Sequence, residues 1–346
     1  MNEHRFFLTA IFLSVLYSIY KLYEPFVMII TIASLLAIAT YNINLKLYSM
    51  CHNRFIAAFL STLFLSVLLF GPIVYSLTSL GSIVNNFDFT VVDKIQTYLR
   101  NANYQLPDPL AFLQPSLNDF IASLNIAHIS NLVLGYLGSM GKNSAGFLKD
   151  MLLIVLFFFF ASLNGKDLID YIKSVMPMED KEVNFVFSEV TNVMSVVFYS
   201  ILVSAIFQGM LFAFIAICFG YDGLLLGILY GFASLIPIVG GVLMWGPLAL
   251  YELTYGDSTS ALIIALYSVI VISTIADNFV RPLIIKYINH SFVKTPTNVN
   301  ELLIFFAIFA GLTTFGFWGM ILGPAITTLF ISLLKLYKIL KEKRYM

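Results

Sequence analysis

The residues best suited to chemistry lie in one short segment, IADNFVRPLIIK, residues 275–286. Asp277 and Arg281 are spaced to meet on one helical face, where a carboxylate and a guanidinium form an ion pair, and Asn278 and Pro282 lie beside them. A charge deep in a bilayer costs about 2.5 to 3.5 kcal/mol on insertion scales, so an acid within a membrane span is a candidate for binding a solute. The alternative is structural: if a span ends near residue 277, a salt-bridged helix end before a proline explains the pair.

Composition places this segment in an integral membrane protein. The chain is 60% hydrophobic and 11% charged, and its mean hydropathy of +0.90 lies outside the range of soluble domains. Its 19 basic and 19 acidic residues balance, so no nucleic-acid partner is expected. The two cysteines provide neither a disulfide framework nor a zinc site, and the HExxH, CxxC and GxSxG motifs are missing from the sequence. We therefore expect no enzyme activity and no cofactor.

Apolar segments suited to single spans occur along the whole chain, since a helix needs about 20 apolar residues to cross a bilayer. After the third of them the chain becomes mixed, with apolar residues such as Val92, Ile95 and Leu99 at helical spacing. We expect three regions: an N-terminal three-span region at 1–80, extracytoplasmic amphipathic helices around a proline loop at 81–146, and a transport region at 147–346. The predicted full spans are 6–23, 25–42, 55–79, 147–164, 191–219 and 259–277.

Two further apolar runs, 223–251 and 302–334, are too long for one span and too short for two. At about 1.5 Å rise per residue, the halves of the first run reach roughly 15 to 20 Å, against a hydrocarbon core of about 30 Å. We expect both to be re-entrant hairpins, and kinked single spans are the alternative. Each run is broken by proline, which lacks a backbone N–H, by glycine, which permits a tight turn, or by threonine, which interrupts the apolar residues. These residues are Pro237, Gly240 and Gly241 in the first run, and Thr313, Thr314, Gly316, Gly319 and Pro324 in the second.

Two sequence patterns accompany these breaks. Gly223, Gly227 and Gly231 recur every four residues ahead of the first break, which lets another helix approach closely. GVLMWGPLAL at 241–250 resembles GMILGPAITTL at 319–329. Paired interrupted segments of opposite orientation are typical of inverted-repeat transporters, whose solute binds near the midplane where the two tips meet.

The positions of Lys and Arg favour hairpins over single spans, because short cytoplasmic loops collect positive charge. If both runs were single spans, the loop with Arg281, Lys286 and Lys294 would lie outside the cell. With two hairpins, this loop and the basic tail at 335–344 are cytoplasmic. Most of the 19 Lys and Arg residues then lie inside, and both termini do too.

Three successive segments, 221–250, 276–286 and 310–330, resemble the signatures of the autoinducer-2 exporter (AI-2E) family of bacterial permeases. The resemblance implies an inner-membrane protein that exports a small polar signalling molecule in quorum sensing. It also implies a homopentamer and an elevator-type movement in each protomer. By matching positions, it assigns Pro237, Gly240 and Gly241 to the first hairpin tip, Asp277, Asn278 and Pro282 to a polar helix motif, and Gly316, Gly319 and Pro324 to the second hairpin.

We therefore predict an all-α polytopic membrane protein with about six full spans and two re-entrant hairpins. Its predicted function is secondary transport of a small polar solute through the lipid bilayer, with hairpin tips as gates. Two alternatives stay open. One is a sodium or lithium/proton antiporter in which Asp277 alternately holds a proton and a cation, and the other is a pore or scaffold assembled through residues 81–146.

Overall fold

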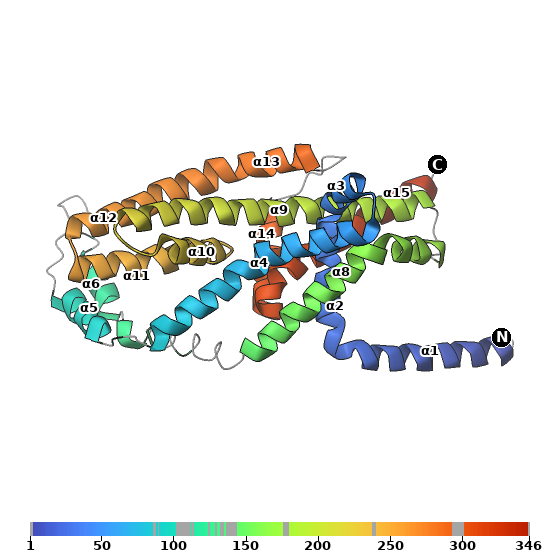
Figure 1. Ribbon diagram of the computed structural model, residues 1–346, viewed down its shortest axis with the longest axis horizontal. Helices are drawn as coiled ribbons and strands as arrows, with labels where there is room; N and C mark the ends of the chain where they lie inside the picture. The colour runs from blue at the N-terminus through green and yellow to red at the C-terminus, as the bar shows by residue number, and fades with distance from the viewer. Residues whose placement is uncertain are drawn as a thin grey trace. The chain divides into compact units, whose positions relative to one another are not determined.

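The computed structural model describes residues 3–85, 88, 90–101, 112, 114–123, 125–128, 130–131, 135, 144–175, 180–236, 240–292 and 301–344. Its elements in this part of the chain are helices, without a strand among them. Six of the helical stretches described there are long and apolar enough to cross a membrane, so the chain is an all-α polytopic membrane protein (Figure 1). They are Phe6–Ala39, Arg54–Gly81, Gly146–Val175, Lys181–Cys218, Ser258–Ile288 and Gly319–Lys338.

The number of such stretches agrees with the prediction, but two of them differ in place. The predicted spans 6–23 and 25–42 form a single stretch that is interrupted by one 3₁₀ turn. Its second part ends at Thr40, whose backbone N–H and hydroxyl both donate to the carbonyl of Leu36. The sixth stretch is the second arm of the run predicted as a hairpin at 302–334. The N-terminal elements are α1 (Glu3–Tyr23), η1 (Glu24–Phe26), α2 (Val27–Ala39) and α3 (Tyr41–Cys51).

The chain folds as two packing units. Unit 1 comprises residues 1–66, 148–195 and 294–346, and unit 2 comprises 67–147 and 196–293, so boundaries fall within α4, α8 and α9. The three functional regions predicted from the sequence stay a prediction. The remaining helices are α4 (Arg54–Asn85), α5 (Thr90–Asn101), α6 (Gln114–Ser123), α8 (Ser144–Val175), α9 (Asp180–Cys218), α10 (Gly223–Ala233), α11 (Gly240–Tyr255), α12 (Ser258–Tyr267), the π-helix η3 (Ser268–Val280), α13 (Arg281–Phe292), α14 (Glu301–Phe315), the 3₁₀ turn η4 (Gly316–Trp318) and α15 (Gly319–Arg344).

In unit 1, α14 and α15 form a tight helical hairpin. Gly316 begins the turn at a φ of 63°, in the left-handed region that glycine adopts without steric cost. Gly311 and Gly319 then face each other across the two arms, and a Cβ at Gly311 would lie 1.9 Å from the Gly319 carbonyl oxygen. Gly323 meets Ala307 in the same way. The two backbones are therefore in direct contact along the first turns after the break.

In unit 2, the predicted glycine ladder packs α10 against α9. A Cβ at Gly227 would lie 2.8 Å from the carbonyl oxygen of Gly209, and a Cβ at Gly231 would lie 2.9 Å from that of Ala205. This confirms that the spacing serves close helix approach. The arms α10 and α11 of the first hairpin also pack on each other (Figure 1), and Tyr230 of α10 stacks on Phe212 of α9 with ring centroids 4.5 Å apart.

The amphipathic helix α5 lies against the far end of α11. Val92, Ile95 and Leu99 are buried, which confirms the predicted apolar face, and Lys94 Nζ sits 5.1 Å from the ring centroid of Tyr255. Asp88 precedes the helix and accepts the backbone N–H of Thr90, a hydrogen bond that lowers the pKa of this carboxyl. The proline loop predicted after α5 lies outside the described residues.

A glycine substitution tests the backbone contact in the second hairpin. Gly311→Ala should lower the free energy of unfolding by about 1 to 3 kcal/mol, because the added methyl group meets backbone rather than a movable side chain. Gly165→Ala is the matched control within helix α8: a Cβ there has nothing within 4 Å, so better helix propensity should raise stability by up to about 1 kcal/mol. Thermal unfolding in detergent measures both. Equal stability of the two variants would contradict the contact.

Candidate functional site

The helix that carries Asp277 does not end where the sequence suggested. α12, η3 and α13 form one continuous rod (Figure 1), and the candidate span reaches from Ser258 to Ile288. The helix therefore continues past residue 277, and Asp277 lies within this candidate span, directly after its most apolar part. Its depth in the bilayer stays a prediction. Pro282 does not stop the helix, because the π-helical segment η3 precedes it and the N–H of Arg281 bonds to the carbonyl of Ala276, five residues back.

The π-helical turn displays polar groups on one side. Thr274 Oγ1 donates to the carbonyl of Val269 at 2.8 Å, and Asn278 Nδ2 donates to the carbonyls of Thr274 at 3.0 Å and Ser273 at 3.4 Å. These bonds satisfy carbonyls that the wider helix leaves less well paired. π-Helical segments are rare and occur frequently at functional sites, so this one marks the polar motif independently of its sequence.

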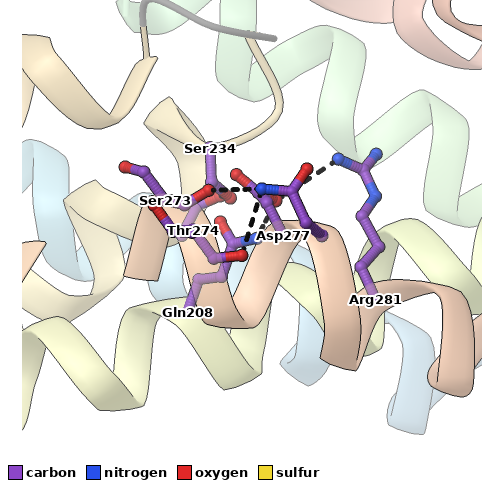
Figure 2. A network of polar contacts seen from close by, with 8 residues as sticks. Gln208, Ser234, Ser273, Thr274, Asp277 and Arg281 are labelled. Carbon is purple, nitrogen blue, oxygen red and sulfur yellow. Dashed lines mark hydrogen bonds and ion pairs between the residues drawn. The ribbon is translucent and has the colours of Figure 1, made fainter. Parts of the chain in front are cut away.

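Asp277 is held by donors from two elements (Figure 2). Gln208 of α9 donates its side-chain N–H to Asp277 Oδ1 at 2.6 Å, and Arg281 Nη1 lies 3.6 Å from the same oxygen. The ion pair confirms the predicted meeting of Asp277 and Arg281. Gln208 is buried, whereas the side chains of Asp277 and Arg281 are 41% and 35% exposed. The carboxylate is thus anchored on one oxygen and still accessible to a small molecule.

The break of the first hairpin lies next to this cluster. Tyr230, in the last turn of α10, and Ser273 of η3 both lie beside Gly241, so the two hydroxyls are neighbours, and Asp277 is near enough to act on Tyr230 electrostatically. Ser234, just past the end of α10, lies beside the same residues in Figure 2. Its hydroxyl donates to the carbonyl of Gly231. The hairpin break and the polar helix motif, which are about 40 residues apart in the chain, therefore form one polar site.

The glycines that open α11 are required by this packing. A Cβ at Gly240 would lie 1.7 Å from the carbonyl oxygen of Ala233, and one at Gly241 would lie 2.8 Å from the hydroxyl of Tyr230. Of the three residues predicted for the first tip, Gly240 and Gly241 are thus in contact with the end of α10. Pro237 lies outside the described residues. Pro282 is exposed at the second position of α13.

The residues predicted for the second hairpin belong to unit 1. Thr313 bonds within its own helix, to the carbonyl of Ala310 at 2.9 Å, and Thr314 is exposed. Gly316 and Gly319 make the turn and the backbone contact described above, and Pro324 is buried in α15. Their relation to the Asp277 cluster in unit 2 stays a prediction.

Three contributors were not among the predicted site residues: Gln208, Tyr230 and Ser273. Gln208 is visible in the sequence as a polar residue in an apolar helix, and its partner is Asp277. Tyr230 and Ser273 are ordinary residues of apolar segments. The signal in the sequence is the position of Tyr230, about two helical turns before Pro237.

At the base of the first hairpin lies a second polar contact, between the hydroxyl of Tyr221 and the buried carboxylate of Glu252. Burial, followed by this hydrogen bond to Glu252, raises the pKa of Tyr221. The contact ties the segment before α10 to the end of α11, so the hairpin is held at both its base and its break.

Comparison with known proteins agrees with this architecture. The family described as AI-2E family transporter matches residues 6–339. Two Helicobacter pylori proteins, from strains J99 and 26695, are each 33% identical over 334 residues, covering 96% of this chain and 95% and 96% of their own lengths. A protein of Aquifex aeolicus is 25% identical over 276 residues, which is 73% of each chain. All three carry the provisional name of transport protein. The chain therefore belongs to the AI-2E transporter family and is a multi-pass membrane transport protein.

Proposed function

We propose that this protein is a secondary transporter that exports a small polar organic molecule, of the autoinducer-2 kind, across the bacterial inner membrane. The observation that carries the proposal is the convergence of the first hairpin break with Asp277. Tyr230, Ser273 and Gln208 bring hydroxyl and amide groups to a carboxylate inside an apolar stretch. Broken helices of this kind form the solute sites of many transporters near the bilayer midplane.

The lengths of the hairpin arms support a re-entrant arrangement. α10 has 11 residues and α14 has 15, which correspond to about 16 Å and 22 Å, so neither crosses a core of about 30 Å. α15 is long enough to cross, and it therefore returns the second hairpin to the cytoplasmic side with the basic C-terminal tail. In the proposed mechanism the two hairpins act as gates in an elevator-type, alternating-access movement.

The charge balance of the site favours an uncharged or dipolar solute. Arg281 compensates the charge of Asp277, and Gln208 occupies the same oxygen. The polar groups nearest to this pair are the hydroxyl of Ser273, which is half-buried, and the side-chain amide oxygen of Asn278, which is exposed. A homo-oligomer, a pentamer by family resemblance, is part of the proposal, and lipid or neighbouring subunits would cover the exposed apolar side chains of α1.

A cation/proton antiporter is the second candidate. The observation in its favour is the partly exposed carboxylate of Asp277 within a candidate membrane span. Acidic residues in membrane helices commonly form proton and ion pathways. The guanidinium of Arg281 argues against it, because a fixed positive group 3.6 Å from Oδ1 repels a second cation.

The central test is Asp277→Asn, which keeps the shape of the side chain and removes its charge. We expect it to abolish efflux of labelled autoinducer-2 from proteoliposomes while the protein still elutes as a folded species, because the charge-assisted hydrogen bond from Gln208 is lost. Asp257→Asn, at an exposed acid before α12, is the control and should transport normally. Flux that is unchanged in Asp277→Asn would remove this residue from the site.

The same vesicles discriminate between the two candidates. A ²²Na⁺ flux with a matching response of an internal pH dye, both lost in Asp277→Asn, would favour the antiporter. Saturable efflux of the organic solute without a cation response would favour the exporter.

Cysteine labelling tests the proposed topology. Ser258 begins α12, and Ser291 lies in the last turn of α13, so the two residues are at opposite ends of one rod. Ser258→Cys should react with an impermeant thiol reagent from outside intact cells, and Ser291→Cys only after the cells are opened. Reaction of both from the same side would contradict the arrangement with two re-entrant hairpins.

A further inference from the structure

Helix α9 carries a stripe of three polar residues in an otherwise apolar stretch. Ser200, Ser204 and Gln208 are spaced by four residues, which places them on one helical face, one turn above another. Their exposed fractions are 6%, 5% and 4%. The last of the three, Gln208, is the residue that binds Asp277. The stripe therefore leads along α9 directly to the candidate site.

The two serine hydroxyls of this stripe differ from the hydroxyls of Thr191 and Ser195 on the same helix. Hydroxyls in membrane helices normally donate to the carbonyl one turn back or to a neighbouring helix. On the same helix, Thr191 donates to the carbonyl of Phe187 at 2.7 Å and Ser195 to that of Ala39 at 3.0 Å. Ser200 and Ser204 have no hydrogen-bond partner among the described residues, although both hydroxyl oxygens are sealed from the surface. Each has hydrogen-bonding capacity that the packed protein does not use.

Tight helix packing does not account for the stripe. The face of α9 that meets α10 is the adjacent one, with Ala205, Gly209 and Ala213 in contact with the glycine ladder. That contact needs small residues, whereas the stripe places polar groups where alanine would pack equally well. A buried hydroxyl without a partner costs free energy unless it meets water or a polar ligand at some stage.

From these observations we infer that Ser200, Ser204 and Gln208 line a path along α9 by which water and an uncharged, hydrogen-bonding solute reach the Gln208 side of Asp277. This path is closed in the present conformation, although the Asp277 side chain itself is 41% exposed. Serine hydroxyls both donate and accept, so they replace bonds to water for a neutral polar group, and the stripe contains no charge that would hold an ion. The inference rests on the proposed function, because it names the access route to the same site.

Cysteine accessibility tests the path without any knowledge of the solute. The starting protein lacks both native cysteines, through Cys51→Ser and Cys218→Ser. In proteoliposomes, Ser204→Cys should react with a water-soluble methanethiosulfonate reagent roughly tenfold faster than either control, because only a hydrated thiol ionises readily. The controls are Ile206→Cys, on an exposed apolar position of α9, and Ser195→Cys, buried and hydrogen-bonded. A rate for Ser204→Cys no higher than both controls would overturn the inference.

Thermal stability gives a second, independent measurement. Ser204→Ala should leave the melting temperature unchanged or raised, since the hydroxyl that it removes has no protein partner. Ser195→Ala should lower it by removing the hydrogen bond to Ala39. An equal loss in both variants would show a structural role for Ser204 and overturn the path. Labelling uses no solute, so fast reaction of Ser204→Cys combined with normal flux in Asp277→Asn would preserve the path and reject the proposed role of Asp277.

Discussion

Backbone contact at glycine is the interaction on which both hairpins depend. In a bilayer the lipid tails are as apolar as leucine, so helices associate through close packing and hydrogen bonds rather than through the hydrophobic effect. Gly227 meets Gly209 between α10 and α9, and Gly319 meets Gly311 between α15 and α14. The arms α10 and α14 are only 11 and 15 residues long. Backbone contacts with neighbouring helices position both of them.

The same contact sets the register of the candidate site. Gly209 of α9 packs on the glycine ladder, and the residue before it, Gln208, reaches Asp277 on the neighbouring face. Tyr230, almost one turn beyond Gly227, reaches Ser273 of the π-helix. A single turn of α9 thus fixes both the hairpin arm and the carboxylate.

The sequence was informative wherever one physical cause determined the pattern. The glycine ladder predicts close approach, the buried Val92, Ile95 and Leu99 follow helical spacing, and Asp277 and Arg281 meet as their spacing requires. Composition alone was enough to predict the membrane class.

The sequence did not predict two features, the continuation of the helix through Pro282 and the end of α2, because in each a second physical effect overrides the local sequence signal. Pro282 normally ends an α-helix, but the preceding π-helical segment accommodates it, and no apolar periodicity reveals a change from 3.6 residues per turn. Similarly, the apolar run after Pro25 is long enough to be read as a span, yet α2 ends at Thr40, where Ser195 of α9 donates to the carbonyl of Ala39. This partner is 156 residues away, so it could not be inferred locally.

The electrostatics of Asp277 limit what the site can carry. An isolated carboxylate at membrane depth costs about 2.5 to 3.5 kcal/mol, and the partners Gln208 and Arg281 offset that cost in the absence of solute. A cation that entered would meet the positive charge of the Arg281 guanidinium, which lies 3.6 Å from Oδ1. A neutral polar molecule needs only to exchange hydrogen bonds with the amide and hydroxyl groups already present. In the proposed site, selectivity would therefore depend on hydrogen-bond geometry rather than on net charge, which fits the small polar organic solute that we propose.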